Sequence, residues 1–397
     1  MTDRTQGARP PGRKGDWDVI VAGAGVFGAW TAWELQRRGR RVLLVDGAGP
    51  AHARASSGGE SRLTRTIYGA DAIYTRMARD SLEAWRWLSG RAGLPVLHAA
   101  GVLMFFHRME AYASASIEVH RALGLPLQEL DRAELARRYP QVAWDGIEFG
   151  LLQPEYGILM ARRSVQTLVA EFVAAGGEYR PDDVATPSEG GPLSALYTAG
   201  GAALQAREFV LACGPWLPKL FPDILGARIF TTRQEIYFFA TPRGDVRFLP
   251  EHLPGWVDFD AGNMYYGCPD LESRGFKLAN DRHGPAFDPD SGDRRPTEAG
   301  LTDARTYLAR RFPVLAGQPL VETRVCQYEN SSGGDFLIDR HPRIENLVLV
   351  GGGSGHGFKH GPAVGRYAAE LVTGEPLPLE PRFSLASKAD VQTRAVR

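Results

Sequence analysis

The hydrophobic pattern at the start of the chain predicts a parallel β-sheet with a helix packed on it. Residues 18–22 (DVIVA) are a short β-branched run of the kind that forms a buried parallel strand. A helix is predicted over residues 26–38, ended by Gly39, and a second apolar strand over residues 42–45 ends in Asp46. This strand–helix–strand order is typical of the α/β class.

The rest of the pattern mixes helices and strands without an internal repeat. Helices are predicted over residues 71–88, 111–123, 131–139, 161–175, 301–312 and 363–373, and strands over residues 101–106, 208–212, 233–240, 262–267, 321–328, 335–339 and 347–350. Residues 284–300 are rich in Pro, Gly and Asp and predict a surface excursion. Because a strand, a glycine turn and a helix occur near both ends, we expect one Rossmann-like domain built from separated segments. The aromatic strands between them predict a second domain.

The first glycine turn carries chemistry that its context makes specific. Gly23, Gly25 and Gly28 follow the first strand at GxGxxG spacing, and Asp46 ends the second strand. The first glycine permits a tight turn, the second lets backbone approach a pyrophosphate, and the third allows close packing of helix on strand. The helix N-terminus attracts the phosphates, and the carboxylate of Asp46 can bind a ribose diol. The segment predicts a dinucleotide site. A glycine turn in an unrelated α/β domain is the alternative, and the choice between FAD and NAD stays open.

Composition narrows the class of partner. The 397 residues carry 46 basic and 46 acidic side chains, so a formal net charge of zero gives no field that would attract nucleic acid or acidic lipid. The three cysteines show no CxxC spacing, which disfavours a disulfide framework or a zinc site. Residues 1–15 are polar and lack a signal-peptide core, and no apolar run is long enough for a membrane span. We therefore expect a cytoplasmic protein with a disordered lead over residues 1–15.

A series of motifs resembles one known family. The pieces are DVIVAGAGVFG at 18–28, SSGGESRLTRTIYG at 56–69, LACGPW at 211–216, YYGCP at 265–269, GFKL at 275–278, CQY at 326–328, DFLIDRHP at 335–342 and GGSGHGFKHGP at 352–362. In this order they resemble the monomeric sarcosine oxidase and N-methyltryptophan oxidase group of the D-amino-acid oxidase superfamily. The resemblance runs from about residue 17 to residue 383.

The resemblance implies a two-domain FAD enzyme that oxidises a C–N bond in an amino acid or amine. The expected fold is α/β, with a Rossmann-like FAD-binding domain and an α+β substrate domain whose sheet is mainly antiparallel. We expect the FAD-binding domain over residues 16–98, 150–222 and 329–385, the substrate domain over 99–149 and 223–328, and a tail over 386–397. A monomer that uses O2 is implied as well.

Two residues gain catalytic roles from the resemblance. Cys326 matches a cysteine that carries FAD through a thioether bond, whereas on spacing alone a small buried core residue is the usual reading. Lys277 matches a lysine over the flavin that promotes reaction with O2, because a fixed ammonium stabilises developing superoxide. A surface lysine is the alternative, although only five lysines occur in the chain. Cys213 and Cys268 match no such position and are expected to be structural.

The resemblance also implies a substrate pocket. Arg65 and Lys359 match a pair of cations that clamps a substrate carboxylate, although Arg65 is one of 41 arginines. Tyr266 and Tyr328 match pocket aromatics, with ordinary core residues as the alternative. Arg62 matches an arginine close to the flavin. The full set expected to bind the cofactor is Gly23, Gly25, Val26, Phe27, Gly28, Asp46, Ser56, Ser61, Arg62, Cys326, Gly353, Gly355, His356, Gly357 and Lys359. No set of metal ligands stands out.

Three departures from the family pattern put sarcosine itself in doubt. Ser57 and Gly58 stand where many members have a pair of histidines. Asp281 replaces a pocket histidine and, if it faces the pocket, would suit a cationic or hydroxylated substrate. Glu329 and Asn330, next to Tyr328, are further candidates for polar specificity.

The expected reaction is hydride transfer from the carbon bonded to nitrogen to flavin N5, which leaves an imine; O2 then reoxidises the flavin and yields H2O2. Three alternatives stay open: a flavin dehydrogenase that uses a carrier acceptor, a NAD-dependent dehydrogenase, and a nucleotide-binding protein without turnover.

Overall fold

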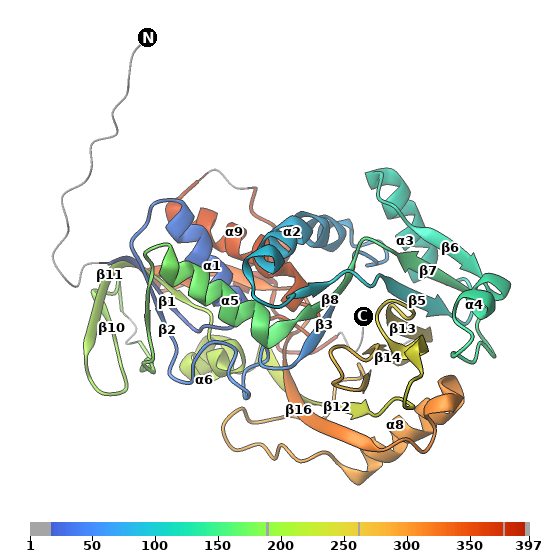
Figure 1. Cartoon of the computed structure of the whole chain (residues 1–397). Helices are drawn as coiled ribbons and strands as arrows, with labels where there is room; N and C mark the ends of the chain where they lie inside the picture. The colour runs from blue at the N-terminus through green and yellow to red at the C-terminus, as the bar shows by residue number, and fades with distance from the viewer. Residues whose placement is uncertain (1–16, 188–189, 261–262, 376–377, 394–397) are drawn as a thin grey trace.

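The computed structural model describes residues 17–187, 190–260, 263–375 and 378–393. Within these ranges the strands form a seven-stranded, an eight-stranded and a three-stranded sheet. Figure 1 shows the seven-stranded sheet with its helices at one end of the molecule and the eight-stranded sheet at the other. The expected α/β class with a mainly antiparallel second sheet is confirmed. The lead expected over residues 1–15 lies outside the described residues.

The seven-stranded sheet brings distant parts of the chain together. Its order is β17-β18-β11-β1-β2-β9, with β10 paired to β11. The strands are β1 (Trp17–Ala22), β2 (Val42–Val45), β9 (Glu178–Arg180), β10 (Ala195–Tyr197), β11 (Ala203–Leu211), β17 (Leu337–His341) and β18 (Ile344–Gly351). Parallel pairing joins β1 to β2 and β11, and β11 to β18. The carboxyl ends of these four strands therefore meet at one edge, where open α/β sheets bind ligands.

One face of this sheet is covered by α1 (Val26–Arg37), α5 (Ala161–Ala174) and α9 (Gly361–Thr373), with α2 (Ala72–Arg91) packed on α5 and α9. Most residues of α1 are buried, because α1 lies between the sheet and the other helices. A Cβ atom at Gly365 would stand 2.6 Å from the backbone of Trp30, so only glycine allows α9 to approach α1 this closely. The opposite face carries α6 (Leu217–Leu220) and α7 (Pro222–Leu225).

The eight-stranded sheet has the order β16-β12-β15-β14-β13-β5-β7-β6 and is antiparallel except between β13 and β5. The strands are β5 (Val102–Phe106), β6 (Gln128–Asp131), β7 (Phe149–Gln153), β12 (Ile229–Phe239), β13 (Gly255–Asp260), β14 (Asn263–Cys268), β15 (Phe276–Asn280) and β16 (Leu320–Ser331). Helix α8 (Glu298–Arg311) packs on one face, where Trp256 stacks on Tyr307 with ring centroids 5.9 Å apart. A buried ion pair of 3.0 Å joins Arg311 to Asp258.

A small sheet connects the two larger ones. It consists of β3 (Ser61–Thr64), β8 (Gly157–Met160) and β4 (Leu97–His98), in the order β3-β8-β4. The remaining helices are α3 (Ala111–Leu123) and α4 (Arg132–Arg138), and short 3-10 turns occur at Gly214–Trp216, Val246–Phe248, Pro313–Leu315, Phe358–His360, Pro381–Phe383 and Leu385–Ser387. Strand β3 contains Arg62, which was expected near the flavin, and leads directly to Arg65, one of the two cations expected to bind the substrate carboxylate.

Some boundaries of elements and segments in the structure differ from the expected ones. Strand β7 pairs with β5 and β6, so residues 150–153 belong to the eight-stranded sheet and not to the nucleotide segment that was expected to begin at 150. Helix α8 begins at Glu298, three residues earlier than predicted, because Thr297 caps it by accepting a hydrogen bond from the Gly300 N–H. Within the expected tail, the Thr393 N–H donates a hydrogen bond to the carbonyl of Ser332.

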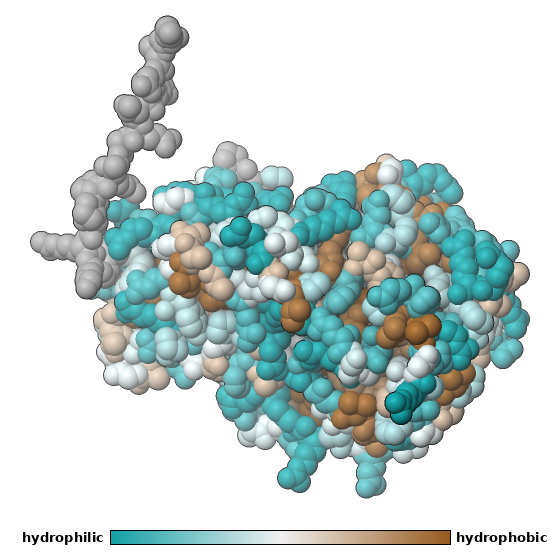
Figure 2. Space-filling view, viewed as in Figure 1, coloured by the Kyte–Doolittle hydropathy of each residue, from teal (hydrophilic) through white to brown (hydrophobic). Residues whose placement is uncertain are grey.

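The surface carries its hydrophobic residues in small groups. Figure 2 shows a mostly hydrophilic face on which hydrophobic residues lie in separate small patches. Among the described residues the most exposed large apolar side chains are scattered along the sequence: Leu94, Met109, Tyr197, Val246, Val321, Leu379 and Val391. Isolated residues of this kind are normal on monomeric proteins and do not define a docking surface.

Candidate active site

The turn between β1 and α1 has the geometry that the glycine motif predicts. Gly23 has a φ of 102°, and a Cβ atom there would lie 2.3 Å from the carbonyl oxygen of Ala212. A Cβ atom at Gly28 would lie 1.9 Å from the carbonyl oxygen of Gly23, so helix α1 meets the turn without room for a side chain. The Asp46 carboxylate accepts a hydrogen bond of 2.7 Å from the Ala24 N–H. The acid at the end of β2 thus lies beside the turn.

A cavity of about 430 Å³ extends from this turn along the edge of the seven-stranded sheet. Its lining includes Gly23, Gly25, Val26, Phe27, Asp46, Ser56, Arg62, Gly353, Gly355 and Gly357 of the expected cofactor set, together with His52, Arg54, Ser57, Gly214, Gln327, Tyr328 and Glu329. The first turn of α1 holds no acidic residue, and the Val26 N–H donates to the hydroxyl of Ser57. An anion-binding helix terminus, a ribose-binding acid and a long cavity fit a dinucleotide such as FAD.

The eight-stranded sheet turns one face toward this cavity. Cross-strand pairs place Lys277 opposite Phe238 and Cys268, and place Tyr266 opposite Ala279. The Lys277 Nζ lies 5.4 Å from the ring centroid of Tyr266. The hydroxyl groups of Tyr266 and Tyr328 are 3.3 Å apart. The alternation of side chains along β14, β15 and β16 explains why these residues share a face.

Lys277 is a buried cation where the eight-stranded sheet meets the three-stranded sheet. Its side chain is 1% exposed, and its Nζ donates a hydrogen bond of 2.7 Å to the carbonyl oxygen of Ser61. Burial lowers the pKa of Lys277 to about 8, and the nearby cation of Arg62 acts in the same direction. The alternative of a solvent-exposed lysine is therefore excluded.

Arg62 and Cys326 meet at the rim of the cavity. The Arg62 guanidinium donates to the carbonyl oxygens of Ser61 and Ser56, both at 2.8 Å, and lies 3.8 Å from the Cys326 sulfur. The hydroxyl of Ser56 in turn donates to the carbonyl of Gln327. The segment before β3 therefore holds strand β16 at the residue that the family resemblance identifies as the flavin attachment point.

Arg65 and Lys359 converge on one aromatic residue, Tyr68. The Arg65 guanidinium lies 4.6 Å from the centroid of the Tyr68 ring, and the Lys359 Nζ donates a hydrogen bond of 2.8 Å to the Tyr68 hydroxyl. That hydroxyl also contacts the imidazoles of His360 and His356. Burial opposes the charge of Arg65, but Tyr112, Tyr68 and Asp281 raise its pKa, so it stays a cation. The structure thus brings both predicted cations together, and Tyr68 is the residue that joins them.

Asp281 lies beside Tyr328 and interacts electrostatically with Arg65. Its carboxylate accepts a hydrogen bond of 2.8 Å from the Tyr328 hydroxyl, and its side chain is buried. Glu329 and Asn330 do not join it. Asn330 donates to the carbonyl of Phe230 and the hydroxyl of Thr232 inside the protein, while Glu329 turns toward the dinucleotide cavity. Of these three residues, only Asp281 contacts a predicted pocket tyrosine, and its role in substrate specificity stays a prediction.

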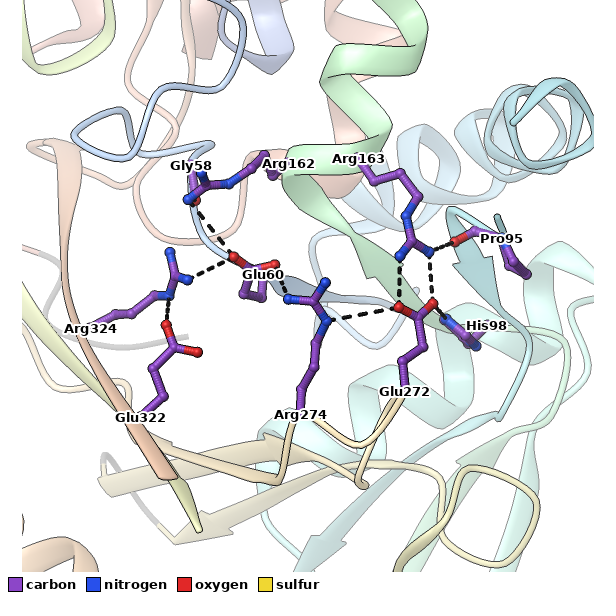
Figure 3. Close-up of polar contacts among 10 residues, drawn as sticks. All are labelled: Gly58, Glu60, Pro95, His98, Arg162, Arg163, Glu272, Arg274, Glu322 and Arg324. Atoms are coloured by element: carbon purple, nitrogen blue, oxygen red, sulfur yellow. Dashed lines mark hydrogen bonds and ion pairs between the residues drawn. The ribbon is translucent and has the colours of Figure 1, made fainter. Parts of the chain in front are cut away.

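A network of ion pairs fixes the strands that carry Lys277 and Cys326 (Figure 3). Glu60 bonds Arg274 at 2.7 Å and Arg324 at 2.8 Å, and Arg162 lies at 3.8 Å. Arg274 precedes Lys277 by three residues, and Arg324 precedes Cys326 by two. A second carboxylate, Glu272, binds Arg163, Arg274 and His98, as Figure 3 shows. This network was not foreseen, because its members are ordinary charged residues without a spacing that indicates contact.

These features define a dinucleotide-binding protein whose cavity lies beside a cluster of buried cations and tyrosines, and comparisons with known proteins give the family. A family model described as FAD-dependent oxidoreductase (DAO) matches residues 18–371. Monomeric sarcosine oxidase of Streptomyces avermitilis is 31% identical over 94% of this chain and 99% of that protein. Human peroxisomal sarcosine oxidase is 29% identical over 93% of this chain and 94% of that protein. The L-proline dehydrogenase of P. horikoshii has a similar fold, with a TM-score of 0.80 at 18% identity over 94% of this chain and 97% of that one.

The chain belongs to the DAO family of FAD-dependent oxidoreductases and is related to its amine and amino-acid oxidases. The match identifies the cofactor as FAD, which the glycine turn alone left open. Across the described ranges, no helix is long and apolar enough to cross a membrane, and no group of His, Cys, Asp and Glu side chains is arranged to hold a metal ion.

Proposed function

We propose that the protein is an oxidase of an amino acid or of a secondary or cyclic amine that carries a carboxylate, with FAD bound covalently through Cys326 and O2 as the electron acceptor. One arrangement carries the proposal: a single face of the eight-stranded sheet carries Lys277, Cys326 and Tyr328. Tyr328 lines the cofactor cavity, and Cys326 lies 3.8 Å from Arg62, which also lines it. We expect the enzyme to act as a monomer.

In the proposed reaction, Arg65 and Lys359 bind the substrate carboxylate. An arginine offers a planar fork and a lysine a compact charge, and Tyr68 holds both in place. The desolvated pocket and the nearby cation Lys277 favour the neutral amine, whose lone pair must stabilise the imine that forms. When bound, FAD would supply the redox chemistry, namely uptake of a hydride from the carbon bonded to nitrogen and delivery of two electrons to O2, which with two protons would give H2O2.

Lys277 would act on the second half of this reaction. A buried ammonium stabilises negative charge that develops on O2, and little reorganisation is needed because the Ser61 carbonyl already fixes it. Asp281 narrows the substrate class: a carboxylate beside Tyr328 favours a substrate with a hydroxyl or a second cationic group over sarcosine.

A substrate screen tests the proposal. Secondary amines, cyclic imino acids and amino acids are each assayed for H2O2 in air and for flavin bleaching without O2, alongside the matching amine that lacks the carboxylate. We expect bleaching and H2O2 with the carboxylated member of a pair and weak activity with the other. Bleaching with an artificial acceptor but no H2O2 in air would instead identify a dehydrogenase, and bleaching by none of the compounds would reject the oxidase.

A further inference from the structure

Glu329 occupies a position that the proposed reaction does not use. Along β16, Cys326 and Tyr328 lie on the face of Lys277, and Gln327 and Glu329 alternate with them on the other face. Gln327 and Glu329 line the dinucleotide cavity, as Tyr328 does. Gln327 is satisfied: its amide donates to the carbonyl of Arg54, and its oxygen accepts from Arg294. Glu329 differs. Its side chain is only 6% exposed, and no described group donates a hydrogen bond to its Oε1 atom.

The Glu329 carboxyl lies between two glycine turns. A Cβ atom at Gly351 would be 2.4 Å from its Oε1, and a Cβ atom at Gly214 would be 4.0 Å from its Oε2. Gly351 ends β18, and Gly214 follows β11, so the carboxyl lies at the strand edge where the cavity runs. A buried oxygen without a partner costs about 1–3 kcal/mol, so a polar group from a ligand is the natural complement at this point.

We propose that Glu329 is a cofactor-binding residue that holds FAD as a neutral carboxylic acid, donating its proton to an oxygen of the dinucleotide on the β18 side of the cavity. Asp46 lies beyond the opposite side of β1, after β2, and therefore serves the other half of the extended cofactor. The half near Glu329 offers phosphate and ribityl oxygens, which accept hydrogen bonds. The inference rests on FAD as the cofactor and not on the proposed oxidase reaction.

Electrostatics favour the neutral acid. Burial raises the pKa of Glu329 to about 8, although the N–H groups of Gly352 and Gly353 act in the opposite direction. An ionised carboxylate, 6% exposed at this point, would also repel the diphosphate, whereas the protonated acid donates to it. FAD should therefore bind to the protein in which Glu329 is protonated, and its affinity should fall as the pH rises above about 8.

Several other charged and titratable groups lie near Glu329. The cavity lining contains Asp46, His52, Arg54, Arg62, Asp182, Asp183, Cys213 and Asp290, and Lys277 lies on the opposite face of β16. Burial raises the pKa of the Cys213 thiol to about 12, above the range that matters. Lys277, with a pKa lowered to about 8, titrates in the same range as Glu329, so the test must separate these two residues.

The test measures FAD binding and not turnover. The full chain with Cys326→Ala, which cannot tether the flavin, is stripped of cofactor and titrated with FAD between pH 6.5 and 9.5 by fluorescence quenching. In the protein that keeps Glu329, we expect the Kd for FAD to rise by up to about tenfold per pH unit above pH 8, because one proton must be regained for binding. Glu329→Gln keeps a donor, so its Kd at pH 7 should stay within about threefold and lose most of the pH dependence. Glu329→Leu should bind about tenfold more weakly at pH 7.

Two controls make the result decisive. Asp183→Asn removes an exposed carboxylate from the same cavity and should leave the pH dependence in place. Lys277→Met removes the other group with a pKa of about 8, and its Kd for FAD should still rise above pH 8 because Glu329 is present. If Glu329→Gln shows the parent's full pH dependence, or if the parent's affinity does not change with pH, the proposal is overturned.

Should the Glu329 variants fail to fold, infrared spectra of the unmodified holoprotein provide the second measurement. A protonated buried carboxyl gives a C=O band that disappears at alkaline pH and shifts when FAD is removed. Absence of such a band at pH 7 would also overturn the proposal.

Discussion

Replacing Lys277 by methionine isolates the charge of this side chain from its volume. Methionine keeps a flexible apolar chain of similar length, so the packing against Tyr266 is retained while the ammonium and its bond to the Ser61 carbonyl are lost. If Lys277 stabilises charge on O2, the variant should be reduced by substrate as before and reoxidised slowly.

The magnitude follows from the burial of Lys277. With the side chain 1% exposed, water screens the ammonium poorly. Two unit charges about 4 Å apart interact by about 4 kcal/mol at an effective dielectric constant of about 20. Each 1.36 kcal/mol is a factor of ten in rate, so a loss of about 3–4 kcal/mol predicts reoxidation slowed by about 10²- to 10³-fold.

The assay separates the two half-reactions. Enzyme is reduced with dithionite, which needs no knowledge of the substrate, and is mixed with O2 in a stopped-flow instrument; reduction by substrate is followed separately without O2. In the unmodified enzyme the oxidation rate should fall as the pH rises through about 8, because the ammonium is present below this pKa and lost above it. The methionine variant should lack this fall. Equal slowing of both half-reactions, or oxidation at the normal rate, would refute the role given to Lys277.

Three further predictions follow from the site. Cys326→Ala should release its flavin on denaturation, while the unmodified protein should keep flavin fluorescence on a denaturing gel; free flavin from the unmodified protein would contradict the tether. Arg65→Lys keeps the charge but not the planar fork, so KM for a carboxylated substrate should rise about 10- to 100-fold, with little change for the amine that lacks the carboxylate. Gly28→Ala places a Cβ atom 1.9 Å from the Gly23 carbonyl, and we expect loss of FAD binding in a titration and a lower melting temperature. Unchanged binding in that variant would show that the turn can adjust.

The parts of the fold that were predictable from sequence are those with strong local patterns. The first strand, the helix at Val26–Arg37 and the strand at Val42–Val45 lie within a residue of their predicted bounds, because a β-branched run and glycines determine them locally. Strands β3 and β15 were not predicted. SRLT and FKLAN have no clear alternation, and their extended form depends on partners that the chain supplies far away in the sequence.

The site shows the same division. Lys277 and Cys326 were found because a family motif marks each of them, and the register of β15 and β16 then explains how both reach one face. Tyr68 and Glu60 lie within the motif at 56–69, but the resemblance assigns no role to either, and an aromatic residue or an acid in a polar segment is common. Their importance arises from what surrounds them in space: two buried cations around Tyr68, and three arginines around Glu60.

The arrangement around Glu60 has an evolutionary consequence. One carboxylate serves arginines from three separate segments, so its loss would leave several cations without their counter-charge at once. Substitution at position 60 should therefore be rare unless positions 274 and 324 change with it. In lineages that descend from this protein, these three positions should vary as a unit, even though more than 200 residues separate the first from the other two.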